Sequence, residues 1–350
     1  FEILLLLLTA AILPQKIKEP SDLYNWLYFI ILIIPSSVLS VEQGSNRFHF
    51  FLMIAALWML MLIQNIIKVI FKHRTVEINM AYKYLPYGTV LSIIIITLLF
   101  LVLAVHGQFN LNMDKVYDYR FEISRNMPFL LRYLLPIAAI SLVGYLSALA
   151  LHRKDIKILF LIVAIGILFF GFSSHKAMLF YPLAVIAFYY LLKLSRPHLV
   201  IMIGICVLSV VTIIITSDEF KTLGAMFANR FVFISSQINF TYFDYFTNNP
   251  FMLWAESKIS FGLVDSELPM GVMHYIGGVM TGNYEVGANT GWVANAYMNA
   301  GLIGIILYAA IIGVIYSLID YWSKIYGMRF VCAACMVPVA TLIMTADLLI

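Results

Sequence analysis

Charged, imidazole and amide side chains stand in a long segment between apolar runs, residues 217–293. Loops of this length inside a compact protein are usually functional or disordered. Disorder needs low hydrophobicity and high charge, whereas this segment is rich in aromatic and apolar residues. We therefore predict that residues 217–293 form a folded cap over a membrane bundle and that the chemistry takes place there.

A polar stripe runs through the first part of this segment. On a helix at about 100° per residue, Arg230, Gln237, Thr241, Asp244 and Asn248 fall within about 40° of one another. Arg230 and Asp244 are about 21 Å apart along such a helix, too far for a simple ion pair. Arg230 is therefore the cation that we most expect to act at a site, with structural hydrogen bonding as the alternative.

The later part of the segment is Gly-rich, and its strong proton-transfer candidates are His274 and Glu285. Glycines let the backbone turn and approach a ligand closely. A lone His is more often a hydrogen-bonded structural residue than a catalytic one. A catalytic or acceptor-binding His274 and a structural His274 both stay open.

A second outward segment, residues 107–126, carries Arg120 and Arg125, and Arg132 follows it. Arg125 and Arg132 are seven residues apart and share one face if the chain is helical there. These cations either bind an anion or anchor the chain at the membrane boundary, where long side chains reach the interface.

A third outward segment is the turn GFSSHKAMLFYP, residues 171–182. Ser173 or Ser174 is expected to cap a helix that begins near Lys176. Free N–H groups, the helix dipole and Lys176 together predict an anion site. The alternative for Lys176 is a lipid headgroup anchor.

The composition indicates an all-α polytopic membrane protein. The chain has 350 residues, of which 63% are hydrophobic and 11% charged, against about 25% charged in a soluble domain. It begins at Phe1 inside an apolar run, so we expect that terminal residues are missing. No repeat or linker divides it, and residues 1–350 are predicted to form one transmembrane domain. With about 20 apolar residues per span, the predicted spans are 1–14, 23–41, 48–71, 85–106, 127–151, 156–173, 176–193, 198–216, 294–319 and 329–349.

Basic residues set the expected orientation. The loops on one side of the ten spans hold 13 of the 22 Lys and Arg residues, and those on the other side hold eight, with Arg132 inside a span. Short loops rich in Lys and Arg stay in the cytoplasm. Residues 217–293 and 107–126 are therefore expected outside the cytoplasm, which is the periplasm in a Gram-negative cell.

Several classes of chemistry lack their motifs here. The sequence contains no GxGxxG, Walker or HExxH motif, so no nucleotide or zinc site is predicted. Cys332 and Cys335 are best explained as small residues in a helix contact. No metal, no other cofactor and no nucleic-acid partner is expected.

Two segments give the chain a likeness to a known family. SSHKAMLFYPLAVIAFYYLL follows a short outward turn, and ANTGWVANAYMNAGLIGIILY enters the next span after one large outward loop. In these features the chain resembles the Wzy-type polymerases of O-antigen and related oligosaccharide repeat units. The last piece is also similar to O-antigen ligases, but Asn289-Thr290 stands where their His-Asn is found. The Arg-x10-Gly pattern of some polymerases is not matched by Arg120, Arg125 or Arg230.

The resemblance implies a lipid-carrier glycosyltransferase of the GT-C-like type in the bacterial inner membrane. Its substrates would be oligosaccharides linked to undecaprenyl diphosphate, and a chain-length regulator protein would be a further partner beside membrane lipids. The polymer would pass to the non-reducing end of a second unit without a metal. Fixed cations must then stabilise the departing diphosphate.

The residues are assigned to these steps as follows. Diphosphate binding is expected from Arg120, Arg125, Arg132, Lys176 and Arg230. Deprotonation of the acceptor hydroxyl is expected from His274, Asp244 or Glu285, unless the transition state needs no strong base. The alternative activities are an O-antigen ligase and, from another class, a lipid-linked oligosaccharide flippase. Transporters usually carry ionisable groups at mid-membrane, which the predicted spans nearly lack.

Overall fold

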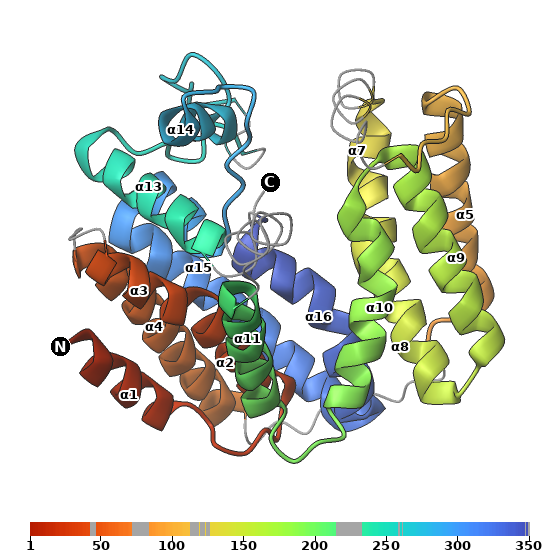
Figure 1. Ribbon diagram of the computed structural model, residues 1–350, viewed down its shortest axis with the longest axis horizontal. Coiled ribbons are helices and arrows are strands. Elements are labelled where there is room, and N and C mark those ends of the chain that lie inside the picture. Colours follow the sequence, from red (N-terminus) through yellow and green to blue (C-terminus); the bar gives the residue numbers. More distant parts are fainter. Residues whose placement is uncertain are drawn as a thin grey trace. The chain divides into compact units, whose positions relative to one another are not determined.

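The computed structural model describes residues 1–42, 47–71, 84–112, 119, 123, 127–214, 233–257, 260, 262–346 and 348. In these residues all regular structure is helical (Figure 1). The chain divides into two compact units. Unit 1 comprises Phe1–Arg74, Arg196–Leu318 and Ala340–Ile350, and unit 2 comprises Thr75–Ser195 and Ile319–Val339.

Unit 1 contains the N-terminal helices and most of the predicted cap. Its helices are α1 (Glu2–Ile12), α2 (Pro20–Tyr28), the π-helix η1 (Phe29–Ile33), α3 (Ile34–Glu42), α4 (Arg47–Phe71), α11 (Pro197–Ile214), α13 (Ile234–Asn248) and α14 (Val272–Thr281). The long α15 (Trp292–Tyr326) begins in unit 1 and ends in unit 2, and α16 (Met328–Met344) begins in unit 2 and ends in unit 1.

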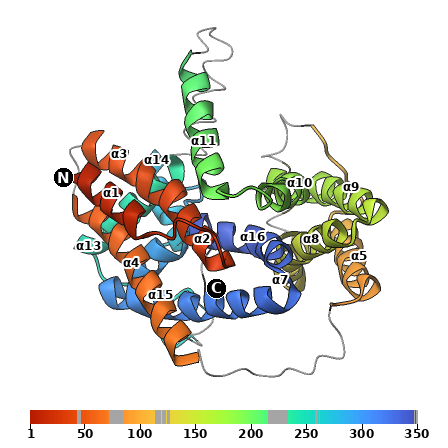
Figure 2. The same ribbon diagram turned by 90° about the horizontal axis from the view of Figure 1, so that it is seen from below.

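Unit 2 is built on antiparallel neighbours joined by short turns. Its helices are α5 (Tyr87–Ala104), α7 (Phe129–Pro136), the π-helix η2 (Ile137–Leu142), α8 (Val143–Arg153), α9 (Ile156–Ser173) and α10 (Lys176–Leu191). Figure 2 shows α8, α9 and α10 side by side, and each packs against the other two. The elements α7, η2 and α8 follow one another without a break.

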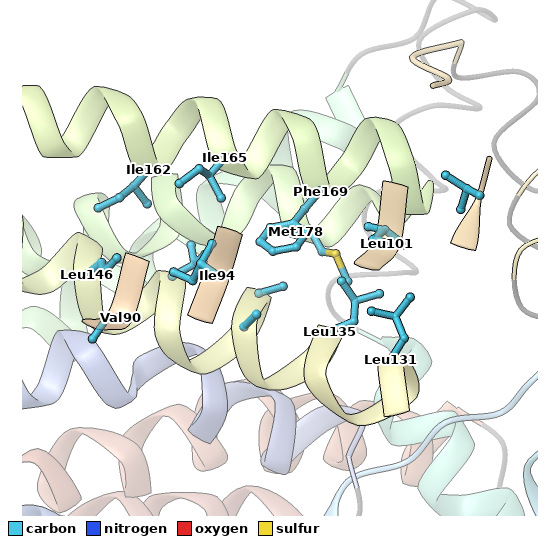
Figure 3. Packing of buried hydrophobic residues seen from close by; sticks show 14 of the residues in the cluster. Val90, Ile94, Leu101, Leu131, Leu135, Leu146, Ile162, Ile165, Phe169 and Met178 are labelled. Carbon is cyan, nitrogen blue, oxygen red and sulfur yellow. The ribbon is translucent and has the colours of Figure 1, made fainter. Parts of the chain in front are cut away.

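A packed apolar cluster holds unit 2 together. Met178 at the start of α10 lies in one cluster with Leu131 and Leu135 of α7, and the cluster continues along α9 through Phe169 (Figure 3). Burying each such side chain contributes about 1.5–3 kcal/mol relative to leaving it exposed. The starts of α7 and α10 are therefore fixed at the same end of unit 2.

The structure bears out a helical membrane protein. Among the described residues, six helices are long and apolar enough to cross a bilayer: Pro20–Val41, Arg47–Ile70, Tyr87–Ala104, Phe129–Arg153, Ile156–Ser173 and Trp292–Tyr326. Only 22% of the α5 window is buried, so most of its apolar surface is available to lipid. Each of the other four predicted spans contains a shorter apolar helix: Glu2–Ile12, Lys176–Leu191, Pro197–Val207 or Met328–Met344. A full set of ten spans stays a prediction.

Helix boundaries follow local chemistry in several places. Pro20 begins α2, and the side chains of Glu19 and Asp22 form a reciprocal capping box there. Such a box satisfies N–H groups that have no partner inside the helix. In the turn between α8 and α9, Lys154 ends α8 in a left-handed conformation, and the Asp155 side chain caps α9 by accepting from the Ile158 N–H.

The helix α15 is interrupted at Ala300 and Gly301, whose dihedral angles are not helical. Gly301 has a φ of +58°, and a Cβ there would meet the ring of Phe251 at 2.8 Å. An interruption leaves carbonyl groups before it without helical donors. The structure therefore requires other donors at this point of unit 1, and the cap provides them.

Candidate functional site

The helix α13 positions Asp244, and its buried face is partly polar. Ser236, Asn239, Phe240, Phe243 and Phe246 are buried on it, where α13 packs against α3 and η1. The hydroxyl of Ser236 donates to the carbonyl of Leu32 at 3.1 Å, which ties α13 to η1. The predicted stripe of Gln237, Thr241, Asp244 and Asn248 is half-buried or exposed.

Asp244 lies beside a buried imidazole. Nε2 of His49, near the start of α4, is 3.3 Å from Oδ1 of Asp244. The His49 side chain is 0% exposed, whereas that of Asp244 is 66% exposed. The rings of Phe240 and Phe243 stand 5.4 and 5.6 Å from the imidazole, centroid to centroid. Asp244 can therefore meet a ligand, and His49 can act only through Asp244.

The contact between His49 and Asp244 is an ion-pair distance without hydrogen-bond geometry. Neither ring nitrogen of His49 makes a hydrogen bond to any residue that the structure describes. Leaving a buried polar group unpaired costs about 1–3 kcal/mol. Catalytic hydrogen bonds in unliganded sites are often long and shorten when the substrate binds. The Asp244 carboxylate can thus accept a proton, and the His49 imidazole can orient that carboxylate.

The helix α14 carries His274, and a loop folds back over it. A Cβ at Gly277 would collide with the carbonyl of Val286, and a Cβ at Gly278 would collide with the Tyr284 ring. Only glycine permits this close backbone approach. The loop is held further by the Ala288 N–H, which donates to the Met273 carbonyl at 2.9 Å.

The three predicted proton acceptors have different surroundings. His274 is half-buried on α14, and its Cε1 would be 3.9 Å from a Cβ built at Gly287. Glu285 is exposed in the loop after α14. Among the residues that the structure describes, Asp244 is the one of the three that lies within ion-pair distance of a second titratable group, His49. The structure thus favours Asp244 over the other two.

The start of α14 is capped from a distance. No side chain adjacent in sequence caps it, and Oε1 of Glu256 accepts from the Val272 N–H at 2.7 Å. Burial raises the pKa of Glu256, and the hydrogen bond from Val272 partly opposes this. A carboxylate at a helix N-terminus also interacts favourably with the helix dipole. Glu256 is therefore a structural residue that the sequence did not indicate.

Tyr245 and Tyr275 connect α13 to α14, with ring centroids 5.4 Å apart. Burial and, to a smaller extent, the hydrogen bond to Tyr275 raise the pKa of Tyr245 to about 12. The phenol therefore stays protonated near neutral pH and does not serve as a base there. It holds the two cap helices together, and with them the position of Asp244.

The segment that follows α13 supplies hydrogen-bond donors at the interruption in α15. The N–H groups of Met252 and Leu253 donate to the carbonyls of Met298 and Asn299 at 2.8 and 3.1 Å. The Trp254 N–H donates to Oδ1 of Asn299 at 2.8 Å. Leu253 and Trp254 have φ values of +45° and +60°, a strained conformation for side chains of this size. This junction locks the chain that follows α13 onto α15.

Lys176 begins α10, as the sequence predicted, but the expected serine cap is wrong. The residue before the helix is His175, and it makes no side-chain cap. The Ser173 hydroxyl donates to the Phe169 carbonyl at 2.6 Å and accepts from the His175 N–H at 3.2 Å. Ser174 takes a left-handed conformation as the end of α9. Neither serine is therefore the N-cap residue of α10.

Ser174 adds an unused hydroxyl beside this helix start. Its side chain is 1% exposed, and its Oγ has no hydrogen-bond partner among the described residues. A buried hydroxyl without a partner is uncommon in proteins. Lys176 and the Ser174 hydroxyl thus lie on either side of the turn between α9 and α10.

Of the four arginines predicted to bind the diphosphate, the structure describes Arg132. Arg132 is exposed on α7 and donates through Nε to the carbonyl of Met127 at 3.1 Å. It lies at the same end of unit 2 as Lys176, because α7 and α10 begin in one cluster. Arg120, Arg125 and Arg230 lie outside the described residues. Their expected roles stay predictions.

No known protein decides between the expected activities. No family model, no curated protein and no solved structure matches this chain. Its own residues must therefore carry the argument. Asp244, His274 and Glu285 belong to unit 1, and Arg132 and Lys176 belong to unit 2.

The described residues contain no group of three or more His, Cys, Asp or Glu side chains placed to hold a metal ion. Cys332 is buried and Cys335 half-buried within α16.

Sequence reasoning missed His49. It stands 195 positions before Asp244, and helical periodicity gives no information on such a contact. A weak signal was present, because His49 is a titratable residue only two positions after Arg47, where a long apolar run begins. Ionisable groups in or beside membrane spans are functional candidates by default.

Proposed function

We propose that this chain is an oligosaccharide repeat-unit polymerase of the bacterial inner membrane, with its site on the periplasmic side. It would transfer a growing glycan from undecaprenyl diphosphate to the non-reducing end of a second carrier-linked unit. The observation that carries the proposal is the exposed Asp244 carboxylate backed by the buried His49 imidazole. The apolar helices and the two sequence segments similar to Wzy-type polymerases support it.

The proposed reaction needs a base for the acceptor. The hydroxyl oxygen of the acceptor sugar forms a bond to the anomeric carbon of the donor, and its proton passes to Asp244. A positioned general base contributes typically about 10²–10⁴ in rate. His49 does not touch the substrate in this scheme. It is a positioning residue that holds the carboxylate in one orientation.

The reaction also needs cations for the leaving group. The bond between the anomeric carbon and the diphosphate oxygen breaks, and the diphosphate leaves with the bonding electrons. Lys176 at the start of α10 is the cation proposed to bind the diphosphate, because the N-terminal end of a helix favours phosphate. Arg230, Arg120, Arg125 and Arg132 keep the diphosphate-binding role proposed from the sequence.

The experiment is a transfer assay with the purified chain and its lipid-linked repeat unit, without nucleotide and with a metal chelator. We expect a ladder of carrier-linked products. Attachment of the glycan to lipid A-core instead would identify a ligase. Movement of the intact unit across a vesicle membrane without any ladder would identify a flippase.

Single substitutions then test the assigned roles. Asp244→Asn is expected to slow transfer by about 10²–10⁴, while Asp265→Asn, an exposed carboxylate in the same predicted loop, serves as the matched control and should not. Arg230→Ala should abolish long polymer in a cell that depends on this chain, at normal protein level. An unchanged chain-length distribution would show that Arg230 has no such role.

A further inference from the structure

Unit 2 carries a second cationic surface, formed where α8 ends and α9 begins. The guanidinium carbon of Arg153 stands 5.4 Å from the ring centroid of Tyr84 and 4.9 Å from that of Tyr87. Both arrangements are cation–π contacts. They hold an exposed arginine in one place, although it forms no ion pair with any residue that the structure describes.

The aromatic wall around Arg153 is itself well connected. The Tyr84 hydroxyl lies 3.2 Å from Nε2 of His152. The Tyr84 ring packs edge-on against Phe330, with centroids 5.4 Å apart, and Phe330 also contacts Tyr145 at 5.6 Å. The first residues of α16 thus hold Tyr84 against the end of α8. We call Tyr84, Tyr87, His152, Arg153, Lys154 and Phe330 the tyrosine–arginine surface.

Further cations surround this surface. Tyr189 of α10 lies close enough to Tyr84 and Arg329 to interact electrostatically with both, and Tyr326 contacts Tyr84 at 5.5 Å. These contacts bring the ends of α10 and α15 and the start of α16 to the tyrosine–arginine surface. The exposed cations at this end of unit 2 are Arg153, Lys154, Lys157, Lys193, Lys324 and Arg329.

Negative charge does not balance these cations. The carboxylates among the described residues of unit 2 are Asp155 and Asp320. Asp155 is half-buried and accepts from the Ile158 N–H as the cap of α9. Asp320 is 2% exposed. The exposed charge at this end is therefore strongly positive, which favours an anionic partner.

We propose that the tyrosine–arginine surface binds the headgroup of an anionic phospholipid. The guanidinium fork of Arg153 matches phosphate oxygens, and Lys154 adds a second charge beside it. Tyrosine side chains favour the level of lipid headgroups. The same loops are those predicted to face the cytoplasm, where anionic lipids attract Lys and Arg. The proposal does not depend on the transfer reaction.

A merely solvated charged face would differ in one respect. Long cationic side chains on such a face are free to move, and aromatic rings do not hold them. Here Arg153 is held by two rings that belong to a packed aromatic cluster. Removing a ring without changing charge should therefore weaken lipid binding if the surface is a site, and should have no effect if it is only a charged patch.

The test uses the full chain purified in detergent and titrated with phosphatidylglycerol or phosphatidylcholine, with bound lipid counted by native mass spectrometry. The wild type should bind phosphatidylglycerol in preference. Arg153→Gln with Lys154→Asn should weaken that binding about 25-fold, since each cation near an anionic headgroup contributes about fivefold. Asn suits the left-handed conformation of Lys154. Tyr84→Leu should weaken binding several-fold at unchanged charge.

The matched control is Lys16→Gln with Lys18→Gln, two exposed cations of unit 1 with the same change in charge. This variant should bind phosphatidylglycerol as the wild type does. Equal weakening in both double variants, or equal binding of the two lipids by the wild type, would overturn the proposal. So would wild-type binding by Tyr84→Leu. Thermal unfolding of each variant shows whether a loss of binding comes from loss of the fold, in which case Lys157→Gln, at an exposed site, replaces the double change.

Discussion

Replacing His49 with leucine should separate stability from activity. The imidazole is fully buried among aromatic rings and lacks a hydrogen bond to the described residues. Leucine has a similar volume and no polar atom. An unpaired buried polar group costs about 1–3 kcal/mol, which His49→Leu recovers. Replacing an unpaired buried polar group by an apolar group of the same shape is often neutral or stabilising for this reason.

Two kinds of lost interaction oppose that gain. The interaction with Asp244 is worth about 0.2–1 kcal/mol, because the carboxylate is mostly exposed and screened by solvent. Each lost ring contact, with Phe240 and Phe243, is worth about 0.5–1.5 kcal/mol at most. At the middle of these ranges the losses nearly offset the gain, so the free energy of unfolding of His49→Leu should lie within about 1 kcal/mol of wild type. Transfer activity should nevertheless fall, because Asp244 loses its positioning partner.

The assay is reversible unfolding in mixed micelles, followed by tryptophan fluorescence and compared with ladder formation by the same sample. His49→Gln serves as a second variant that keeps a polar group at this position. A loss of about 3 kcal/mol or more on His49→Leu, with activity falling only as far as the folded fraction does, would refute the reasoning. His49 would then be a residue of the folded core and no part of a site.

Four further predictions concern Glu256, Gly301 and Lys176. Glu256→Ala should destabilise the cap by about 0.5–2 kcal/mol, because α14 loses the acceptor of the Val272 N–H. The raised pKa of Glu256 also predicts that the free energy of unfolding falls as pH rises from 4.5 to the folded pKa, since the unfolded chain ionises first; Glu256→Gln should remove that slope in unfolding titrations. Gly301→Ala should cost about 1–3 kcal/mol in thermal unfolding, because φ is +58° and a Cβ meets Phe251. Lys176→Gln should slow ladder formation about 100-fold or more.

Each of the three positions has a matched control. Glu267→Ala removes an exposed carboxylate of the same predicted loop and should leave unfolding unchanged. Gly88→Ala adds a Cβ into open space within a helix and should be neutral or stabilising. Lys18→Gln removes an exposed lysine of unit 1 and should leave ladder formation unchanged. If a control substitution has the same effect as the variant it is paired with, the physical reason given for that variant is wrong.

Apolar runs and local signals predicted much of the fold. Each of the ten predicted spans contains a helix, because about 20 consecutive apolar residues leave few other stable forms. The start of α10 at Lys176 and the helical stretch around Asp244 also followed from the sequence. Within α13, the described residues of the predicted polar stripe are half-buried or exposed, and the polar residues Ser236 and Asn239 are buried with the phenylalanines on another face.

What the sequence could not predict are contacts between distant segments. Glu256 caps a helix that begins 16 residues later, and His49 meets Asp244 across 195 residues. Periodicity describes only which residues share a face of one helix. The interruption of α15 at Gly301 was missed for a related reason. Its carbonyls are satisfied by Met252 and Leu253 from the cap, and nothing in the span itself shows that these donors are present.

The rate of ladder formation in the wild type, His49→Leu, Asp244→Asn and the double variant tests the central claim most directly. If His49 acts through Asp244, the double variant should be no slower than Asp244→Asn alone, because residues that work as a unit are strongly non-additive. Losses that add on a free-energy scale, or a wild-type rate in Asp244→Asn, would contradict the account.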